Sequence, residues 1–199
     1  MTMTQPIIPI LTTQSLTQAC EELAQPDSDL AAVYNRLGTP PMWDRDQGFP
    51  TLVHIILEQQ VSLASAKAAF DRLCDIADPL TPESLLKLDD DTLRAVGFSR
   101  QKTRYSRGLA QAILEGTFQP DALPAMADEE ARAHLVNLKG IGNWTADVYL
   151  LMVLRRPDIW PIGDRALVVA AKEVKKLARD PSPEEMETRV HVLLRPRRT

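Results

Sequence analysis

The sequence predicts an all-α protein, and three observations lead to this fold class. First, apolar residues recur at a spacing near 3.6 in successive stretches of the 199 residues, which is the period of an amphipathic helix. Second, several of these stretches begin at Ser, Thr or Asp and end near Gly or Pro, the residues that typically start and stop helices. Third, we find no convincing alternation of apolar and polar residues of the kind that a half-buried strand shows.

The sequence of residues 1–76 predicts a segment without a regular pattern, followed by four helices. Residues 1–11 have no strong pattern and contain prolines that oppose a helix. Asp27 and Gly38 are expected to open and close the second helix, and Ser62 is expected to cap the fourth. The expected helices span 15–24, 27–37, 49–57 and 63–76.

The second part of the chain predicts further helices with equally clear boundaries. Thr81-Pro82 is a helix start with Thr as the N-cap, Ser99 begins another helix, and Asp128 is an expected N-cap. The acidic run 89–91 is interpreted as a solvated helix N-terminus rather than a metal-binding loop, and 116–126 as a connecting loop. The expected helices lie between 82 and 96, after 99, over 129–138, over 144–154 and after 164.

Two glycines flank one apolar residue in the stretch from Leu138 to Ala146. Gly140-Ile141-Gly142 is expected to form a hairpin between two helices. Glycine permits positive φ and leaves backbone amides uncovered, and amides at the start of a helix favour an anion such as a phosphate diester. From the residues alone, a helix-turn-helix corner that uses glycine for its geometry is an equally good interpretation.

Charge is distributed unevenly along the chain, whose formal net charge is -4. Residues 1–93 contain 5 Lys and Arg against 14 Asp and Glu, whereas residues 94–199 contain 18 against 13. Any phosphate-facing surface is therefore expected from the second part of the chain. Without further motifs, ordinary solvated surface explains the asymmetry equally well.

The hairpin stretch, followed by Trp-Pro-Ile-Gly-Asp-Arg-Ala-Leu at 160–167, resembles the helix-hairpin-helix DNA glycosylases. Within this superfamily the sequence is most similar to the 3-methyladenine DNA glycosylase II (alkylbase DNA glycosylase) branch. The resemblance runs from about 42 to 171 and also includes Ile-Leu-Glu-Gln-Gln-Val-Ser at 56–62 and Gly-Phe-Ser-Arg-Gln-Lys at 97–102.

This resemblance implies a two-lobed helical fold with a cleft between the lobes that holds a flipped base. We expect residues 1–199 to form a single unit of this kind. One lobe would span about 45–140, and the other would combine about 1–44 with about 141–199.

The resemblance also implies a monofunctional DNA glycosylase of base excision repair. Such an enzyme hydrolyses the N-glycosidic bond of alkylated purines, such as 3-methyladenine and 7-methylguanine, in duplex DNA after base flipping. Asp164 is the expected catalytic residue, because an ionised carboxylate stabilises the positive charge that develops on the sugar or positions the attacking water. Taken in isolation, the same residue would be interpreted as a helix N-cap.

Trp144 occupies the position where members of the superfamily that also cut the strand carry a lysine, which forms a Schiff base. We therefore expect no lyase activity, and Lys139, on the other side of the turn, is no substitute. An indole face instead suits a cationic alkylated purine, since cation–π attraction contributes roughly 0.5–2 kcal/mol. Trp43, Trp160 and Tyr149 are further base-pocket candidates, although each is equally well explained as a core residue.

The corner formed by Gln59 and Gln60 is expected to enter the minor groove and fill the gap left by the extruded nucleotide. Gln60 is the first candidate for this wedge and Gln59 the second, and the alternative is that both only hydrogen-bond the corner. The remaining expected DNA contacts are Ser62, Arg100, Lys102, Lys139, Gly140, Ile141, Gly142 and Thr145. For Arg100 and Lys102, ordinary solvated surface is an equally good interpretation.

The sequence predicts no redox or nucleotide cofactor and no metal centre, although hairpin carbonyls could hold a monovalent cation at the phosphate. Cys20 and Cys74 are isolated and are interpreted as small core residues. No apolar run has membrane-spanning length, and the N-terminus lacks an export signal, so we expect a cytoplasmic, nucleoid-associated monomer.

The C-terminus departs from the family pattern, because Leu-Arg-Pro-Arg-Arg-Thr at 194–199 ends the sequence where another helix usually follows. We expect a closing helix to be absent, and Arg195, Arg197 and Arg198 could contact phosphates instead. Two alternatives to the glycosylase remain: a catalytically inactive helix-hairpin-helix DNA-binding protein, and a helical protein-interaction domain.

Overall fold

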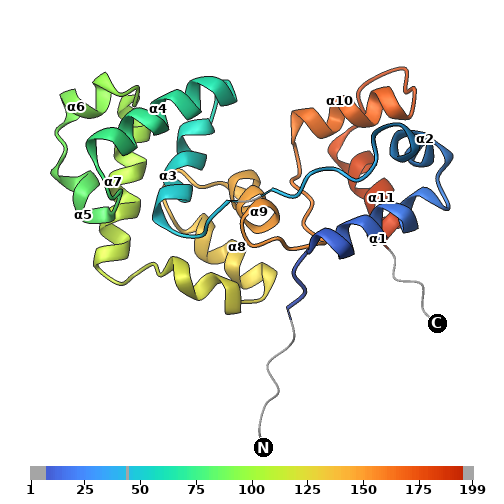
Figure 1. The fold of residues 1–199 in the computed structure, drawn as a ribbon, viewed down its shortest axis with the longest axis horizontal. Helices are drawn as coiled ribbons and strands as arrows, with labels where there is room; N and C mark the ends of the chain where they lie inside the picture. Colours follow the sequence, from blue (N-terminus) through green and yellow to red (C-terminus); the bar gives the residue numbers. More distant parts are fainter. Residues whose placement is uncertain (1–7, 44, 195–199) are drawn as a thin grey trace, which may run out of the picture. The chain divides into compact units, whose positions relative to one another are not determined.

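A computed structural model describes residues 8–43 and 45–194, with side chains described as far as residue 188. Every regular element in these residues is a helix, so the all-α prediction is confirmed (Figure 1). Contacts between Cα atoms divide the chain into two compact units, unit 1 (Met1–Asp44 with Arg155–Thr199) and unit 2 (Arg45–Leu154). Among the described residues, no helix is both long and apolar enough to cross a membrane.

Unit 2 contains the densest packing of the chain. Its core is built from side chains such as Leu52, Ile55, Leu73, Leu93 and Leu135, all almost completely buried. Its elements are α3 (Phe49–Glu58), α4 (Leu63–Ile76), α5 (Pro82–Lys87), α6 (Asp90–Ala95), α7 (Arg100–Leu114), the 3-10 helix η1 (Pro120–Ala125), α8 (Asp128–Val136) and α9 (Asn143–Met152). Helix α3 contacts α4, α7 and α9, so it is the central element of the unit.

Unit 1 is built from segments at both ends of the chain. Its helices are α1 (Thr13–Ala24), α2 (Ser28–Leu37), α10 (Arg165–Val174) and α11 (Pro183–Leu194). Helix α2 packs against both α1 and α10. Lys175, which ends α10, donates hydrogen bonds to the carboxylate of Asp27, the N-cap of α2. This ion pair joins two segments that lie far apart in the sequence.

Most of the expected helix starts are confirmed, because capping depends on residues close together in the sequence. The hydroxyls or carboxylates of Asp27, Ser62, Thr81 and Ser99 accept hydrogen bonds from backbone amides at the starts of α2, α4, α5 and α7. The expected cap at Asp128 is wrong: α8 begins at Asp128, and Ala127 is its N-cap without a side-chain hydrogen bond. The expected loop over 116–126 contains η1, which begins at Pro120.

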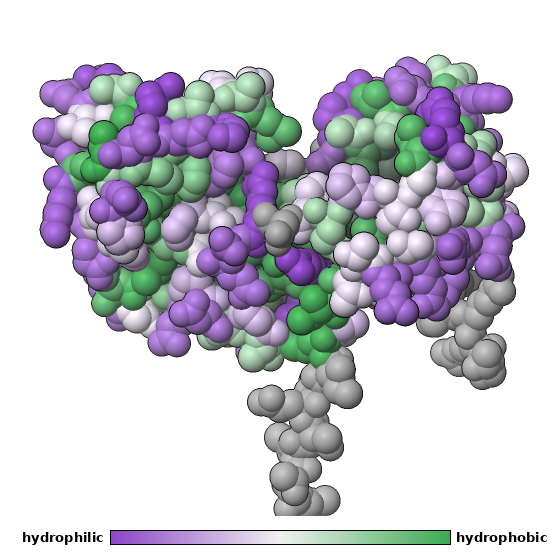
Figure 2. Space-filling model, in the orientation of Figure 1, coloured by the Kyte–Doolittle hydropathy of each residue, from purple (hydrophilic) through white to green (hydrophobic). Residues whose placement is uncertain are grey.

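The boundary between the two units lies after Leu154 and not near residue 140, where it was expected. Helix α9 packs on α8 and α3, so the chain leaves unit 2 only after Leu154. The physical reason is that α9 is buried over most of its length, with six consecutive buried residues from Thr145 to Leu150. On the face drawn in Figure 2, hydrophilic residues cover much of the surface, interrupted by hydrophobic patches.

Helix α11 lies at the end of the described chain. This helix leads into the Leu-Arg-Pro-Arg-Arg-Thr segment, whereas the closing helix expected to be absent would follow that segment, so that expectation stays a prediction. The arginines at 195, 197 and 198, which could contact phosphates, lie outside the described residues.

Candidate functional site: the hairpin, the α3–α4 corner and Asp164

Helices α8 and α9 form the predicted hairpin in unit 2. The amide of Ile141 donates to the carbonyl of Leu138 at 3.0 Å, which closes the turn, and the Ile141 side chain is buried beneath it. Arg132 of α8 donates to the carboxylate of Asp147 of α9 at 2.7 Å, and Asp147 is almost completely buried. The ion pair and the buried isoleucine hold the two helices together behind an exposed turn.

The two glycines of the hairpin differ in what requires them. Gly140 has φ 96, and a Cβ added there would lie 2.2 Å from ring atoms of Tyr105. Gly142 has φ -93, and an added Cβ would meet nothing within 4 Å. Packing and backbone conformation therefore explain the glycine at 140, whereas nothing in the protein requires a glycine at 142.

The beginning of α9 faces solvent at its first residues. Gly142 is the N-cap and provides no side-chain hydrogen bond to the helix amides. Trp144 is 37% exposed, and Lys139 is exposed on the other side of the turn. Helix amides, a cation and an indole face thus lie within one short stretch of the chain, where the helix dipole favours an anion.

The two glutamines at the corner between α3 and α4 have different surroundings. Gln59 points to the hairpin: its Nε2 donates to the carbonyl of Gly140 at 2.9 Å and to Oγ1 of Thr145 at 3.3 Å. Gln60 is exposed and has φ 59, a left-handed conformation that is uncommon for a non-glycine residue. This arrangement favours Gln60 over Gln59 as the residue that could enter a groove.

Several expected DNA contacts have structural roles in unit 2. Lys102 donates from Nζ to the carbonyl of Leu57 near the end of α3 at 2.6 Å, and burial lowers the pKa of its ammonium. The Thr145 side chain is buried, and the Ser62 hydroxyl caps α4. Arg100 remains exposed at the start of α7, so Arg100 and Lys139 are the expected cations with solvent-facing side chains.

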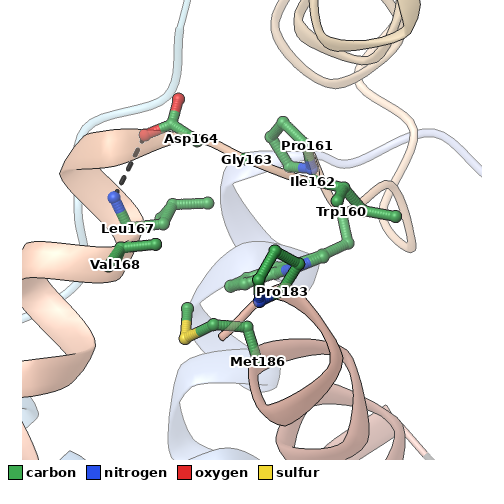
Figure 3. A pocket seen from close by; sticks show the side chains of 9 residues that line it. All are labelled: Trp160, Pro161, Ile162, Gly163, Asp164, Leu167, Val168, Pro183 and Met186. Atoms are coloured by element: carbon green, nitrogen blue, oxygen red, sulfur yellow. Dashed lines mark hydrogen bonds between the residues drawn. The ribbon is translucent and has the colours of Figure 1, made fainter. Parts of the chain in front are cut away.

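Asp164 is the N-cap of α10 in unit 1. Its Oδ1 accepts a hydrogen bond from the amide of Leu167 at 3.1 Å, and the residue is half-buried. Figure 3 shows its second oxygen pointing away from Pro183 and Met186. The cap fixes the carboxylate at the start of α10, where the helix dipole is positive. The N-cap interpretation and a catalytic role are therefore compatible.

The other aromatic candidates lie in different surroundings. Trp160 lines a small hollow of ≈ 20 Å³ together with Asp164, Pro183 and Met186, and this hollow has room for about one water molecule (Figure 3). Tyr149 is completely buried, and its hydroxyl accepts from the amide of Gly48 at 3.4 Å. Tyr149 is therefore a core residue, whereas Trp160 is partly exposed beside Asp164 and Trp43 is 48% exposed.

The carbonyls of the hairpin already accept hydrogen bonds within unit 2. The Leu138 carbonyl accepts from Ile141, the Gly140 carbonyl from Gln59, and the Gly142 carbonyl from Ala146. Each carbonyl oxygen has a second lone pair, so the expectation of a monovalent cation stays a prediction.

Sequence reasoning missed three residues that support these elements. Tyr105 packs its ring against Gly140, and Arg45 makes two hydrogen bonds to the carboxylate of Glu58, at 2.7 and 3.0 Å. Tyr105 and Arg45 belong to no motif quoted above, although their partners Gly140 and Glu58 do. A glycine at 140 is the only signal in the sequence that a large side chain packs there.

The sequence is similar to those of two known proteins that are named as DNA-3-methyladenine glycosylases. YfjP of Bacillus subtilis is 30% identical over 168 residues, which cover 80% of this chain and 58% of YfjP. DNA-3-methyladenine glycosylase 1 of Schizosaccharomyces pombe is 27% identical over 143 residues, 70% of this chain and 63% of that protein. The chain thus spans about three fifths of the length of these two relatives.

Solved structures share the fold. The Schizosaccharomyces pombe 3-methyladenine DNA glycosylase in complex with abasic DNA superposes with a TM-score of 0.83 at 24% identity, covering 90% of each chain. A DNA-3-methyladenine glycosidase from Bacillus halodurans superposes with a TM-score of 0.76 at 25% identity, covering 95% of this chain and 87% of that one. Residues 53–196 match the family model described as HhH-GPD superfamily base excision DNA repair protein, and this match includes the corner, the hairpin and Asp164. The chain therefore belongs to the HhH-GPD superfamily of base excision DNA repair proteins.

Proposed function

We propose that this chain is a monofunctional DNA glycosylase that releases alkylated purines, of the 3-methyladenine and 7-methylguanine type, from duplex DNA. The observation that carries the proposal is the carboxylate of Asp164, held by the Leu167 amide at the start of α10 in a chain of a base excision repair superfamily. Relatives named as DNA-3-methyladenine glycosylases support the substrate class.

The proposed reaction is hydrolysis of the bond between the damaged base and C1′ of the sugar. As this bond breaks, positive charge develops on the sugar, and the Asp164 carboxylate stabilises it or orients the attacking water. N-alkylated purines are cationic and leave easily, so the reaction needs little help from a general acid. Trp144 would stack on the cationic ring through its exposed face.

DNA binding is assigned to the hairpin and the α3–α4 corner. The amides at the start of α9 would contact a phosphate, close to the uncovered Gly142, and the exposed Lys139 and Arg100 would add electrostatic attraction. Gln60 would fill the space of the extruded nucleotide, offsetting part of an extrusion cost of a few kcal/mol. The absence of a lysine at 144 predicts that the abasic strand stays uncut.

The test is Asp164→Asn, with Asp89→Asn as the matched control. Both residues are helix N-caps whose carboxylates accept from a backbone amide, and Asn caps helices about as well as Asp, so both variants should fold normally. Loss of the charge at 164 should lower single-turnover base release from methylated duplex DNA by roughly 10²–10³-fold while leaving duplex binding largely intact. The Asp89 variant should keep the wild-type rate.

Two results would contradict the proposal in different ways. Base release by Asp164→Asn at the wild-type rate would remove Asp164 from the mechanism. Duplex binding by the wild-type chain without any release of base would instead indicate a catalytically inactive DNA-binding protein.

A further inference from the structure

The last residues of α3 are held from three directions. The Leu57 carbonyl accepts from Lys102 of α7 at 2.6 Å, and the Glu58 carboxylate pairs with Arg45, which precedes α3 in the sequence. The next residue, Gln59, donates to the hairpin at Gly140. Three consecutive residues are thus fixed by three different parts of unit 2, so the end of α3 has little freedom to move.

Gln60 follows this fixed segment in a strained conformation. A left-handed backbone at a residue other than glycine costs about 1–2 kcal/mol and persists where the surrounding structure determines it. Its neighbours Val61 and Leu63 are 45% and 69% exposed, so the two large apolar side chains of the corner also face solvent. The corner therefore presents one polar and two apolar side chains to solvent from a rigid base.

Gln59 is the direct link between this corner and the hairpin. Its amide group donates to two oxygen atoms, the Gly140 carbonyl and Thr145 Oγ1, and these lie in the turn and the first turn of α9. Gly140 is itself fixed from another side by the ring of Tyr105. The corner could therefore move relative to the hairpin only if the Gln59 hydrogen bonds broke.

We propose that Gln59 is a positioning residue that fixes the distance between the phosphate-binding hairpin and the Gln60 corner, so that both engage one duplex together. This inference rests on the proposed function, because it assumes that the hairpin and the corner both contact DNA. Gln59 itself touches no DNA. It acts by keeping Gln60 at the position from which the gap left by an extruded nucleotide can be filled.

Loss of the Gln59 hydrogen bonds should impair base extrusion without weakening duplex binding. Removal of the Gln59 donor leaves the hairpin amides and the surface cations unchanged, so the phosphate contacts that dominate duplex affinity should persist. The corner, however, is no longer held at one distance from the hairpin, and a misplacement of about 1 Å can cost up to about 10²-fold in a rate that depends on geometry. The extrusion step should therefore suffer, and binding should not.

The test compares Gln59→Met with the matched control Gln111→Met. Methionine has nearly the length of glutamine but no donor, and Gln111 makes only an exposed hydrogen bond to Glu115 within α7. Duplex affinity and single-turnover base release are measured on a duplex with one 7-methylguanine placed either opposite cytosine or opposite an abasic-site analogue. In the second duplex the target is unpaired, so extrusion costs less.

We expect Gln59→Met to release the paired base about 10- to 100-fold more slowly than wild type, with duplex affinity unchanged within about twofold. The unpaired base should be released at nearly the wild-type rate, and Gln111→Met should match wild type on both duplexes. Equal losses on the paired and unpaired targets would indicate general structural damage and overturn the inference, as would wild-type release of both. If Gln59→Met fails to fold, Gln59→Glu supplies the same comparison, because its carboxylate cannot donate to Gly140.

The positioning role of Gln59 can also be tested if the wild-type chain releases no base. In that case the proposed function fails, and the positioning role is judged by the preference of each protein for a duplex containing an abasic-site analogue over an intact duplex. Wild type should show this preference and Gln59→Met should lose it. If the variant keeps the wild-type preference, or if neither protein shows one, the inference is overturned.

Discussion

The two units are stabilised by different interactions. In unit 2, α3 alone contributes six buried side chains and α9 another six, and the hairpin is closed by a buried ion pair. In unit 1, helices α1, α2 and α10 contribute none, and among the described side chains only Ile159 and Met186 are buried hydrophobic residues. The described residues of unit 1 include ion pairs near the surface, among them that of Lys175 with Asp27 and Asp29.

This difference separates the proposed DNA-binding elements from the proposed catalytic group. The hairpin and the corner belong to the unit with the larger core, where tight packing resists displacement. Asp164 belongs to the unit held mainly by its helix caps and charges. We therefore expect unit 2 to respond to changes in packing and unit 1 to changes in charge and pH.

The largest expected effect is that of Gly140→Ala in unit 2. The added methyl group would collide with the Tyr105 ring at 2.2 Å, and φ 96 is unfavourable for alanine. Overpacking costs roughly 1–3 kcal/mol and the left-handed conformation about 1 kcal/mol more, so the free energy of unfolding should fall by about 3 kcal/mol. Denaturant unfolding measures this change.

Gly142→Ala is the matched control for that prediction. Its added methyl group meets no protein atom, so the free energy of unfolding should change by less than about 0.5 kcal/mol. If the hairpin binds a phosphate as proposed, the same methyl group should weaken duplex binding by roughly tenfold, about 1.4 kcal/mol. Similar unfolding curves for both variants would contradict the packing argument.

A smaller effect is expected from Asp27→Asn in unit 1. The Lys175 ammonium that donates to Asp27 holds the pKa of this carboxyl below its ordinary value of 3.8. A carboxyl with a lowered pKa stabilises the folded state fully above its ordinary value, and this contribution disappears as the pH falls through the lowered pKa. Asn keeps the helix cap but removes the charge, so it isolates the ion pair.

The expected loss at pH 7 is up to about 1 kcal/mol, and the difference from wild type should vanish in strong acid. Urea unfolding at a series of pH values, with hydrogen exchange to locate the change in unit 1, measures it. Asp71→Asn is the control, because it breaks an exposed ion pair with Lys67 in unit 2 and should have little effect. A loss that persists unchanged at low pH would show that the charge of Asp27 is not the cause.

Local features of the fold could be predicted from the sequence, and long-range contacts could not. The caps at Ser62, Thr81 and Ser99 depend on amides within three residues, so the sequence alone identified them. The roles of Lys102 and Gln59 depend on partners 45 and 81 residues away, and no local pattern encodes such pairs. The sequence therefore suggested Lys102 only as a DNA contact or a solvated surface residue, and its hydrogen bond to the end of α3 could not be foreseen.

In the candidate site, too, local features could be predicted from the sequence and long-range contacts could not. The N-cap role of Asp164 could be predicted because the glycine before it and the helix after it are local, and this role is confirmed, whereas its catalytic role stays a prediction. The boundary near residue 140 was misplaced because the depth to which α9 is buried depends on α3, which lies far away in the sequence. The sequence offered both Trp144 and Trp160 as base-pocket candidates, and only the structure shows that the indole of Trp144 is 37% exposed whereas that of Trp160 lies beside Met186.

The smallest expected effect is a gain in stability, from Gln60→Gly at the corner of unit 2. Glycine adopts φ 59 without the steric cost that glutamine has, although its greater freedom in the unfolded chain offsets part of the gain. The free energy of unfolding should rise by about 0.5 kcal/mol, whereas release of a paired damaged base should fall because nothing then fills the gap. Gln119→Gly, at a residue with φ -124, is the matched control and should not be stabilised. A Gln60→Gly protein that is less stable than wild type would show that the exposed side chain makes stabilising contacts, and the strain at residue 60 would no longer argue for a function there.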